Sequence, residues 1–583
     1  MAKAKHNGAE RVEQITVFGG IDARSPNGGG SAAYDIKNFR IAADGSLVRR
    51  DGFSHLASLY EDVRCVHVYQ DAEGEYLLAV AGARLYRVSL SDGALESASA
   101  LFTSEGAASF FTHGGELYLC DGAEVYHYRG GLTLVPCMGY VPLYGKDWSF
   151  IYNTNSVHEP INLLCPKIRV HYLREYADEE LTSFVVNVGM EVVSVDRVLI
   201  DGEEVAFTCG SSDRRLVHLS SVHYGSEVEV CLTVGDLYFR DADLRSSTHA
   251  LLFDGFSDER LFLYGGNRAD TLYVSYPVAD GALAASRRME PTSTGLYIPK
   301  GTESRVGNGA AITAAVKAED RVMLCTADGA WITERLTEAE LPLGARPRMR
   351  TLSQTLGSLA VGGGTALQGR MPVTLSRGGL YRWNIDQDLD RECETVCLSR
   401  EIEPLVGWDF FGEASLLRVK RSDELWLFRP SDPEGRIWIY GCDGGAWYSF
   451  AGVRATHLFE TGRGVGFADG KDVFLFRGGL DRDLLPLGDR SIKASVTGRR
   501  GDAGDREALK KATRLYLEAY APKSEITVGL IDGNLLDEVS FAAMPGPAVY
   551  CAKVCTPRFH RVGYTLKAEG EGAVRIFGLC LHC

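Results

Sequence analysis

Two features are missing from this sequence: a long apolar run and an excess of basic charge. The longest stretch without a charged residue, 351–369, is rich in Gly, Ser, Thr and Gln and is too polar to span a bilayer. Residues 1–14 are charged and polar and lack the apolar core of an export signal, which predicts synthesis in the cytoplasm. The net charge of −15 argues against a protein that grips nucleic acid, which needs a basic surface. An acidic surface past which DNA slides is compatible with this charge.

Catalytic and cofactor-binding motifs are also missing. The two Gly-Lys pairs, at 145–146 and 470–471, are each followed by Asp and lack the upstream Gly of a Walker A loop. Glycines 28–30 lack the strand-to-helix context of a dinucleotide fingerprint. The sequence contains neither a zinc-protease His-Glu-x-x-His nor a Gly-x-Ser-x-Gly elbow. We therefore expect no enzymatic activity, no catalytic residue and no cofactor.

One group of residues near the C-terminus has the chemistry of a zinc site. Cys551, Cys555, Cys580, His582 and Cys583 together offer four thiols and an imidazole. Two cysteines four residues apart on a strand are also simply two residues on one face, and chain ends are commonly mobile. We expect no metal here, and the question of zinc stays open at this stage.

Two weaker patterns also resemble metal sites. Asp386, Asp388 and Asp390 alternate as at the start of a calcium loop, but the Gly that an EF-hand requires next is absent. A solvated acidic loop is the favoured interpretation. Cys393 and Cys397 lie in a strand-like run without a neighbouring His, which indicates two residues on one face of a strand.

Glycine and apolar residues are abundant. The 583 residues include 65 glycines but 19 prolines, with 45% hydrophobic and 10% aromatic residues, which is typical of many short strands joined by tight glycine turns. The length favours three or four domains, although propellers can be longer single units. Several of the 14 cysteines lie in apolar strand-like runs, namely Cys65, Cys120, Cys231 and Cys325, and this predicts free buried thiols.

A repeat with an offset of 40 residues places 77–86 over 117–126. Each copy has an apolar strand, a turn at Gly and a second strand that carries an aromatic residue. Further copies lie at 261–274, 322–332, 373–383, 437–448 and 464–476. One hairpin cannot bury its own apolar face, so about seven hairpins predict a β-propeller-like body. An elongated array of β-sandwiches is the alternative. The cassette aromatics could stack on sugars, but blade packing explains their matching positions better.

The repeat is interrupted once and ends before the C-terminus. The interruption holds about five alternating strands, which predicts an inserted β-sandwich, and the residues after about 489 predict a C-terminal β-domain with a short helix at 507–511. The fold class is therefore all-β. The expected units are an N-terminal arm with the first strands (1–60), a first propeller segment (61–165), the inserted sandwich (166–237), a second propeller segment (238–488) and the C-terminal domain (489–583).

Short motifs along the chain resemble one protein family. Residues 18–22 read FGGID, 38–40 NFR, 44–47 DGSL and 49–53 RRDGF. This is similar to the opening of the tail nozzle and packaged-DNA stabilisation (head-completion) proteins of short-tailed bacteriophages. Later motifs that fit the same family are YVP at 140–142, EPINLLCPK at 159–167, RLFLYGG at 260–266, LYVS at 272–275, LGS at 356–358, LSRGG at 375–379, and the end from RFHR at 558–561 to GL at 578–579.

The resemblance implies a structural role in a virion tail. Such proteins form a ring of subunits, typically six, below the portal and adaptor, and they hold packaged DNA in and then conduct it out without sequence-specific binding. The family has no catalytic residues to carry over. The cysteine-rich C-terminus is not part of the family pattern.

Two other functions remain as alternatives. One is a different phage component of the same architecture, such as a tail hub or a host-contact protein. The other is a cellular propeller that binds a carbohydrate or peptide, or a hydrolase on that scaffold, which would need paired carboxylates at the blade centre.

Overall fold

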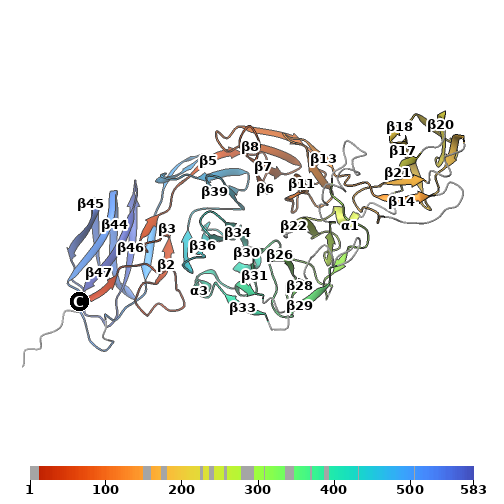
Figure 1. Ribbon diagram of the computed structural model, residues 1–583. Helices are drawn as coiled ribbons and strands as arrows, with labels where there is room; N and C mark the ends of the chain where they lie inside the picture. The colour runs from red at the N-terminus through yellow and green to blue at the C-terminus, as the bar shows by residue number, and fades with distance from the viewer. Residues whose placement is uncertain are drawn as a thin grey trace, which may run out of the picture.

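Three bodies lie in a row in a computed structural model of the chain: the C-terminal domain, a propeller and an inserted sandwich (Figure 1). The structure describes residues 12–148, 159–172, 180–223, 227–235, 242–254, 259–276, 295–307, 309–334, 347–367, 370–385, 393–430, 432–503 and 506–583.

The propeller consists of seven antiparallel blades of four strands each within the described residues. Five blades are separate four-stranded sheets, blade six continues into the 13-stranded sheet of the C-terminal domain, and blade seven is part of a six-stranded sheet. Blade one is β6 (Val63–Gln70), β7 (Glu75–Ala81), β8 (Arg84–Ser89) and β9 (Leu95–Ser99), and blade two is β10 (Ser109–His113), β11 (Glu116–Cys120), β12 (Val125–Tyr128) and β13 (Leu134–Pro136). Blade three is β22 (His249–Asp254), β23 (Glu259–Tyr264), β24 (Thr271–Val274) and β25 (Ser304–Arg305), and blade four is β26 (Ala314–Ala318), β27 (Arg321–Cys325), β28 (Ala330–Thr333) and β29 (Met349–Ser353). Blade five is β30 (Gly364–Leu367), β31 (Met371–Ser376), β32 (Gly379–Asn384) and β33 (Glu394–Cys397), and blade six is β34 (Ser415–Val419), β35 (Glu424–Phe428), β36 (Ile437–Gly441) and β37 (Ala446–Phe450).

Blade seven closes the ring with a strand from the other end of the chain. It combines β38 (His457–Thr461), β39 (Gly464–Asp469) and β40 (Asp472–Phe476) with β5 (Phe53–Ser58), which pairs antiparallel with β40. The first strands of neighbouring blades touch in the order β6, β10, β22, β26, β30, β34 and β38, and β38 returns to β6. The body is thus a closed propeller and not an array of sandwiches.

The second strand of each blade is covered on both faces by neighbouring blades, which explains why the cassettes are continuous apolar runs. Along β7, Leu77, Ala79 and Ala81 pack with residues of blade seven. Leu78 and Val80 pack with residues of blade two. Successive side chains of a strand point to opposite faces, and both faces of a blade are covered, so every position is apolar.

The seven predicted hairpins fall one in each blade. Six of them join the second and third strands of a blade, whereas the hairpin 437–448 joins the third and fourth strands of blade six, β36 and β37. Their aromatic residues are mostly buried between blades, including Tyr86, Tyr126 and Trp383. Blade packing is therefore the role of these rings. The expected burial of the free thiols Cys65, Cys120, Cys231 and Cys325 is also confirmed.

The inserted sandwich leaves the propeller between β13 and β22. One sheet contains β14 (Leu143–Trp148), β15 (Lys167–Tyr172), β21 (Val228–Val234), β17 (Val192–Ile200) and β18 (Glu203–Glu204). The other contains β16 (Leu181–Val185), β20 (Leu216–His223) and β19 (Phe207–Cys209). A separate apolar cluster fills the space between them. The sandwich starts earlier than residue 166, because β14 pairs with β15 in parallel.

The C-terminal domain is built from both ends of the chain. Its own strands are β43 (Ala494–Gly498), β44 (Arg514–Asp532), β45 (Asn534–Lys553), β46 (Gly563–Gly570) and β47 (Arg575–His582). Added to these are β1 (Val12–Ile15), β2 (Ala33–Lys37), β3 (Phe39–Ile41) and β4 (Leu47–Arg49). The expected N-terminal arm, 1–60, is thus divided: β1–β4 belong to the C-terminal domain and β5 to the propeller.

Helical structure is sparse among the described residues, with short helices such as α1 (Ala242–Arg245), α3 (Glu403–Val406) and α4 (Phe410–Glu413). The helix expected at 507–511 is wrong. Lys510 instead exchanges two backbone hydrogen bonds with Phe559, of 2.8 and 2.9 Å, so tertiary pairing overrides the local preference. Among the residues that the structure describes, no helix has the length and hydropathy to cross a membrane.

His249, the first residue of β22, makes the propeller sensitive to acid. Its ring stacks on Tyr264 at 5.4 Å, and its Nδ1 lies 2.7 Å from Thr248 Oγ1. Burial lowers the pKa of His249 from 6.5 to about 4. Between these values the unfolded chain binds a proton that the folded chain does not, so stability falls as the pH drops through this window, by about 3 kcal/mol for this group.

We expect the His249→Gln variant to lose less folding stability than the parent chain when the pH falls, because it lacks the histidine that binds a proton on unfolding. The measurement is the urea midpoint of tryptophan fluorescence at pH 7.5 and pH 4.5. His560→Gln, at an exposed position, is the control. An equal pH dependence in both variants would contradict the assignment.

Candidate functional site

Asn38 is the centre of the joint between the propeller and the C-terminal domain. It lies between β2 and β3 with a φ of 58°, in the left-handed region. Its Nδ2 donates to the Lys493 carbonyl at 2.8 Å, and its Oδ1 accepts from Arg50 Nε and from the Ala451 N–H, both at 2.8 Å. Its own N–H donates to the Ser449 carbonyl of blade six at 2.7 Å. One side chain therefore joins the N-terminal strands, blade six and the C-terminal sheet.

A buried ion pair completes this joint. The two terminal nitrogens of the Arg50 guanidinium, Nη1 and Nη2, donate to the carboxylate of Asp483 on β41 (Arg482–Leu485), at 2.8 and 2.9 Å. The side chains of Arg50 and Asp483 are 2% and 1% exposed. Arg490, on the hairpin partner β42 (Gly488–Ser491), adds a bond of 2.9 Å from a 45% exposed side chain. A buried bidentate pair of this kind imposes geometry as well as charge balance.

Two motif glycines let the chain pass through this joint. Gly20 has a φ of 93°, and a Cβ there would lie 3.0 Å from the backbone nitrogen of Trp447. A Cβ on Gly52 would lie 1.8 Å from the carbonyl oxygen of Arg482. No other residue fits at Gly52, and any other is strained at Gly20. Phe53 follows, with its ring 4.9 Å from Phe467 in blade seven.

Asn162 is the centre of a second polar joint, at the base of the inserted sandwich, as Asn38 is of the first. It is fully buried, and its Nδ2 donates to the carbonyls of Tyr140 and Leu296 at 2.8 and 3.1 Å. Its Oδ1 accepts from the N–H groups of Leu164 and Ile298, both at 3.1 Å. The amide thereby uses donors and acceptors alike to hold the chain on either side of β14 against the segment 296–298 of blade three.

Other residues of the EPINLL motif support this second joint. The carboxylate of Glu159 accepts from Tyr140 Oη at 2.7 Å and from the Leu143 N–H at 2.6 Å. Arg245 of α1 donates to the Leu164 carbonyl at 2.7 Å and pairs with buried Glu124 of blade two. The motif is thus structural: it anchors the sandwich to the propeller.

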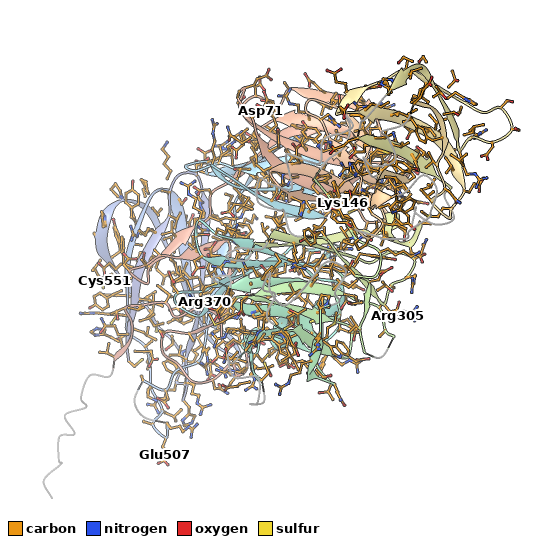
Figure 2. All side chains as sticks on the ribbon, turned by 45° about the vertical axis from the view of Figure 1, so that its right-hand side comes forward. Asp71, Lys146, Arg305, Arg370, Glu507 and Cys551 are labelled. Carbon is orange, nitrogen blue, oxygen red and sulfur yellow. The ribbon has the colours of Figure 1, made fainter. Side chains whose placement is uncertain are left out.

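A hollow of about 620 Å³ lies at the rim between blades three and four. Its lining is mixed in charge, with Arg268, Arg305 and Glu303. The two guanidinium groups each approach a carboxylate at 3.7 Å, those of Asp243 and Asp270. Arg305 lies at the edge of the molecule away from Cys551 (Figure 2).

A second hollow, of about 250 Å³, lies on the outer face of β1, β47, β44 and β45. Gly578 forms its floor, because it has no side chain between Glu518 and Thr16 on the neighbouring strands. The Tyr516 ring lies 4.8 Å from the imidazole of His582. The two rings are tilted by 48°, and aromatic faces beside a carboxylate can bind a small polar ring by stacking and hydrogen bonding.

The cysteines considered for zinc are spread over this same domain. Cys551 on β45 and Cys580 on β47 are register partners of Tyr516 on opposite sides of β44. Cys555 follows β45 and is exposed, and Cys583 follows His582 at the chain end. Over the described residues, no three His, Cys, Asp or Glu side chains come close enough together to hold a metal ion.

Of the other two metal-like patterns, the structure describes only the second. Asp386, Asp388 and Asp390 lie outside the described residues. Cys393 packs beside the cluster that contains Trp383. Cys397 lies on β33 with its Sγ 3.7 Å from Ser399 Oγ.

Sequence reasoning missed Asp483, the partner of Arg50. It lies in an ordinary charged stretch, DRD at 481–483, and nothing in the pattern separates the buried second Asp from the first. Its partner is 433 residues away in the chain.

Comparisons with known proteins extend to the fold alone. No protein-family model and no curated protein sequence matches the chain. Among solved structures, PorZ of the Porphyromonas gingivalis type-IX secretion system is 12% identical, with a TM-score of 0.35, and the match covers 84% of this chain but 46% of PorZ. The WD40 domain of SCAP from fission yeast is 10% identical, covering 80% of this chain and 97% of that one, with a TM-score of 0.29. U3-55K is 12% identical, covering 65% and 91%, with a TM-score of 0.26.

The strand pairing defines an all-β protein: a β-propeller with an inserted β-sandwich and a C-terminal β-domain. The polar joints are the features that set how the three bodies are connected.

We expect Asp483→Asn to destabilise the joint by about 3–5 kcal/mol, because Arg50 then keeps a buried, uncompensated charge. Arg490→Gln should cost about 1 kcal/mol or less, since that partner is half exposed. Urea unfolding of both variants tests this difference. Equal costs would show that the buried pair does not hold the joint.

We expect Asn162→Ala to loosen the sandwich base while the propeller stays folded. The buried N–H groups of Leu164 and Ile298 lose their acceptor, and such a group costs about 1–3 kcal/mol when left unpaired. Hydrogen exchange at the Leu164 and Ile298 amides should accelerate about tenfold or more. Asn267→Ala, at an exposed position, is the control and should leave both amides protected.

Proposed function

We propose that the chain is a structural virion protein, a subunit of a ring-shaped tail nozzle of a short-tailed bacteriophage. In this role it retains packaged DNA and conducts it during ejection. Its partners are further copies of itself, six in the expected ring, the portal and adaptor, and other tail proteins. The proposal places the protein in the virion tail after synthesis in the host cytoplasm.

One observation carries the proposal: the motifs that resemble the nozzle family coincide with the two joints. Gly20, Asn38, Arg50 and Gly52 hold the C-terminal domain on the propeller, and Asn162 holds the sandwich. Motifs that set the placement of whole domains are expected in a subunit whose outer domains must meet neighbouring copies at fixed positions. They would have less use in a protein that only needs one binding pocket.

The charge of the chain supports the same role. A net charge of −15 repels the DNA backbone, so a ring of such subunits would let DNA pass without binding it. A closed propeller also leaves few strand edges exposed, which suits a rigid wall.

The alternative is a host-contact or cellular propeller that binds a carbohydrate or peptide. The hollow beside Tyr516 and His582 is the observation that favours it, because an aromatic pair and the carboxylate of Glu518 suit a polar ring.

Mass photometry and negative-stain microscopy of the purified chain, alone and with the adaptor, test the nozzle proposal. Rings of about six copies are expected, and Asp483→Asn should reduce ring yield more than Arg490→Gln does. A chain that stays monomeric with every tail partner would refute the proposal. Glycan-array binding by that monomer, lost in Tyr516→Ala, would establish the alternative.

A further inference from the structure

The propeller has two unlike faces, and one of them carries all the links between blades. In antiparallel four-stranded blades, the turns between second and third strands lie on the same face as these links. Contacts agree with this: the Val63 N–H donates to the Gly470 carbonyl at 3.0 Å, and Arg64 donates to the carbonyls of Gly82 and Thr103, both at 2.9 Å. We call this side, with the links 59–62, 100–108, 354–363 and 398–414, the linking face.

The exposed apolar side chains of the propeller all lie on the linking face. Within the described residues of the seven blades and their links, the large apolar side chains most open to solvent are Tyr60 (73% exposed), Phe102 (72%), Val361 (60%) and Trp408 (69%). Each lies in a link from the fourth strand of one blade to the first strand of the next. The other exposed large apolar residues lie outside the blades, in the sandwich, the N-terminal strands and the C-terminal region. All four side chains are therefore presented on one face of the propeller.

Two of these rings are held in equivalent positions. Tyr60 lies 6.3 Å from Tyr86, and Phe102 lies 6.0 Å from Tyr126. Tyr86 and Tyr126 are the matching aromatics of the 40-residue repeat, and the Phe102 N–H donates to Tyr126 Oη at 2.9 Å. Each exposed ring therefore rests on a buried one. Binding to such preorganised groups costs less conformational entropy.

Trp408 is positioned by a different contact. Its ring lies against the turn at Gly378, where a Cβ would be 3.1 Å from the indole. Val361 lies in the preceding link of the ring, between blades four and five. The four side chains thus form two pairs, each from consecutive links.

The charge around these rings is acidic. Exposed Glu61 and Asp62 follow Tyr60, and exposed Glu105 follows Phe102, while the links 59–62 and 100–108 contain no basic residue. Exposed Asp409 follows Trp408, and the link 398–414 has four acidic residues against one Arg. The links that carry Tyr60, Phe102 and Trp408 are therefore acidic and attract cations. Exposed Arg377, Arg454 and Lys471 also lie on the linking face.

We propose that the linking face is a docking surface for another protein, which presents an extended segment of basic residues flanked by apolar or aromatic ones. The apolar side chains of that segment cover Tyr60, Phe102, Val361 and Trp408, and its Lys or Arg side chains pair with the carboxylates beside them. The inference stands on this face alone and does not depend on the nozzle role.

The test uses the full chain and a yeast-displayed library of random 12-residue peptides. Selected peptides should combine Lys or Arg with apolar residues, and their affinity should fall when NaCl rises from 50 to 300 mM. The variant Tyr60→Ser/Phe102→Ser/Trp408→Ser should bind the same peptides at least tenfold more weakly. The matched control Leu487→Ser/Leu535→Ser/Val549→Ser removes exposed apolar side chains outside the blades and should bind like the parent.

A second variant keeps the test decisive if the serine variant is poorly folded. Glu61→Gln/Asp62→Asn/Glu105→Gln changes only exposed carboxylates and should weaken the salt dependence while the circular dichroism stays unchanged. Failure to enrich any peptide, or equal binding by the parent and both linking-face variants, would overturn the proposal. Enrichment of purely acidic peptides would do so as well. Ring formation by the same preparations is scored separately, so the fate of the nozzle proposal does not decide this one.

Discussion

The insertion of the N-terminal strand β5 into blade seven is the constraint on which the rest of the molecule depends. A propeller blade is apolar on both faces, so the last blade must be covered by the first, and an open ring would leave two apolar faces in water. Pairing of β5 with β40 supplies the fourth strand of the last blade and links residues more than 400 positions apart. Closing so long a stretch of chain carries an entropic cost that the buried blade faces must offset. The residues just before β5 then have to lie beside the C-terminal domain.

The polar joints follow from that placement. Asn38 and Arg50 enter a region where blade six, the β41–β42 hairpin and the C-terminal sheet all meet, and water is excluded. Buried polar groups of this kind contribute little net stability, but an alternative arrangement would leave them unpaired, so they select one geometry. Asn162 does the same at the sandwich base with an uncharged amide. The two outer domains are thus attached by specific hydrogen bonds as well as by apolar packing.

The joints and the linking face have different roles, and this difference bears on function. The joints hold outer domains in place, and the linking face presents aromatic rings and carboxylates to solvent. A subunit of a larger assembly needs both: fixed arms to meet its own copies, and a separate surface for a different partner. The hollow beside Tyr516 lies on the C-terminal domain, far along the chain from the linking face, and is available to a third kind of contact.

The sequence by itself determined the local hairpins, because an apolar run, a Gly turn and an aromatic strand are specified by neighbouring residues. The seven cassettes, the inserted sandwich and the buried thiols could all be predicted in this way. It could not reveal that 437–448 joins the third and fourth strands of its blade, or that Lys510 pairs with Phe559 and lies in no helix, because both depend on which distant segment supplies the hydrogen bonds. Nor could it separate exposed Tyr60 and Phe102 from buried Tyr86 and Tyr126, since burial is a property of the neighbours and not of the residue. Tertiary structure alone decided that Arg50 meets Asp483 and that both ends of the chain share one sheet, because these contacts exist only when the ring closes.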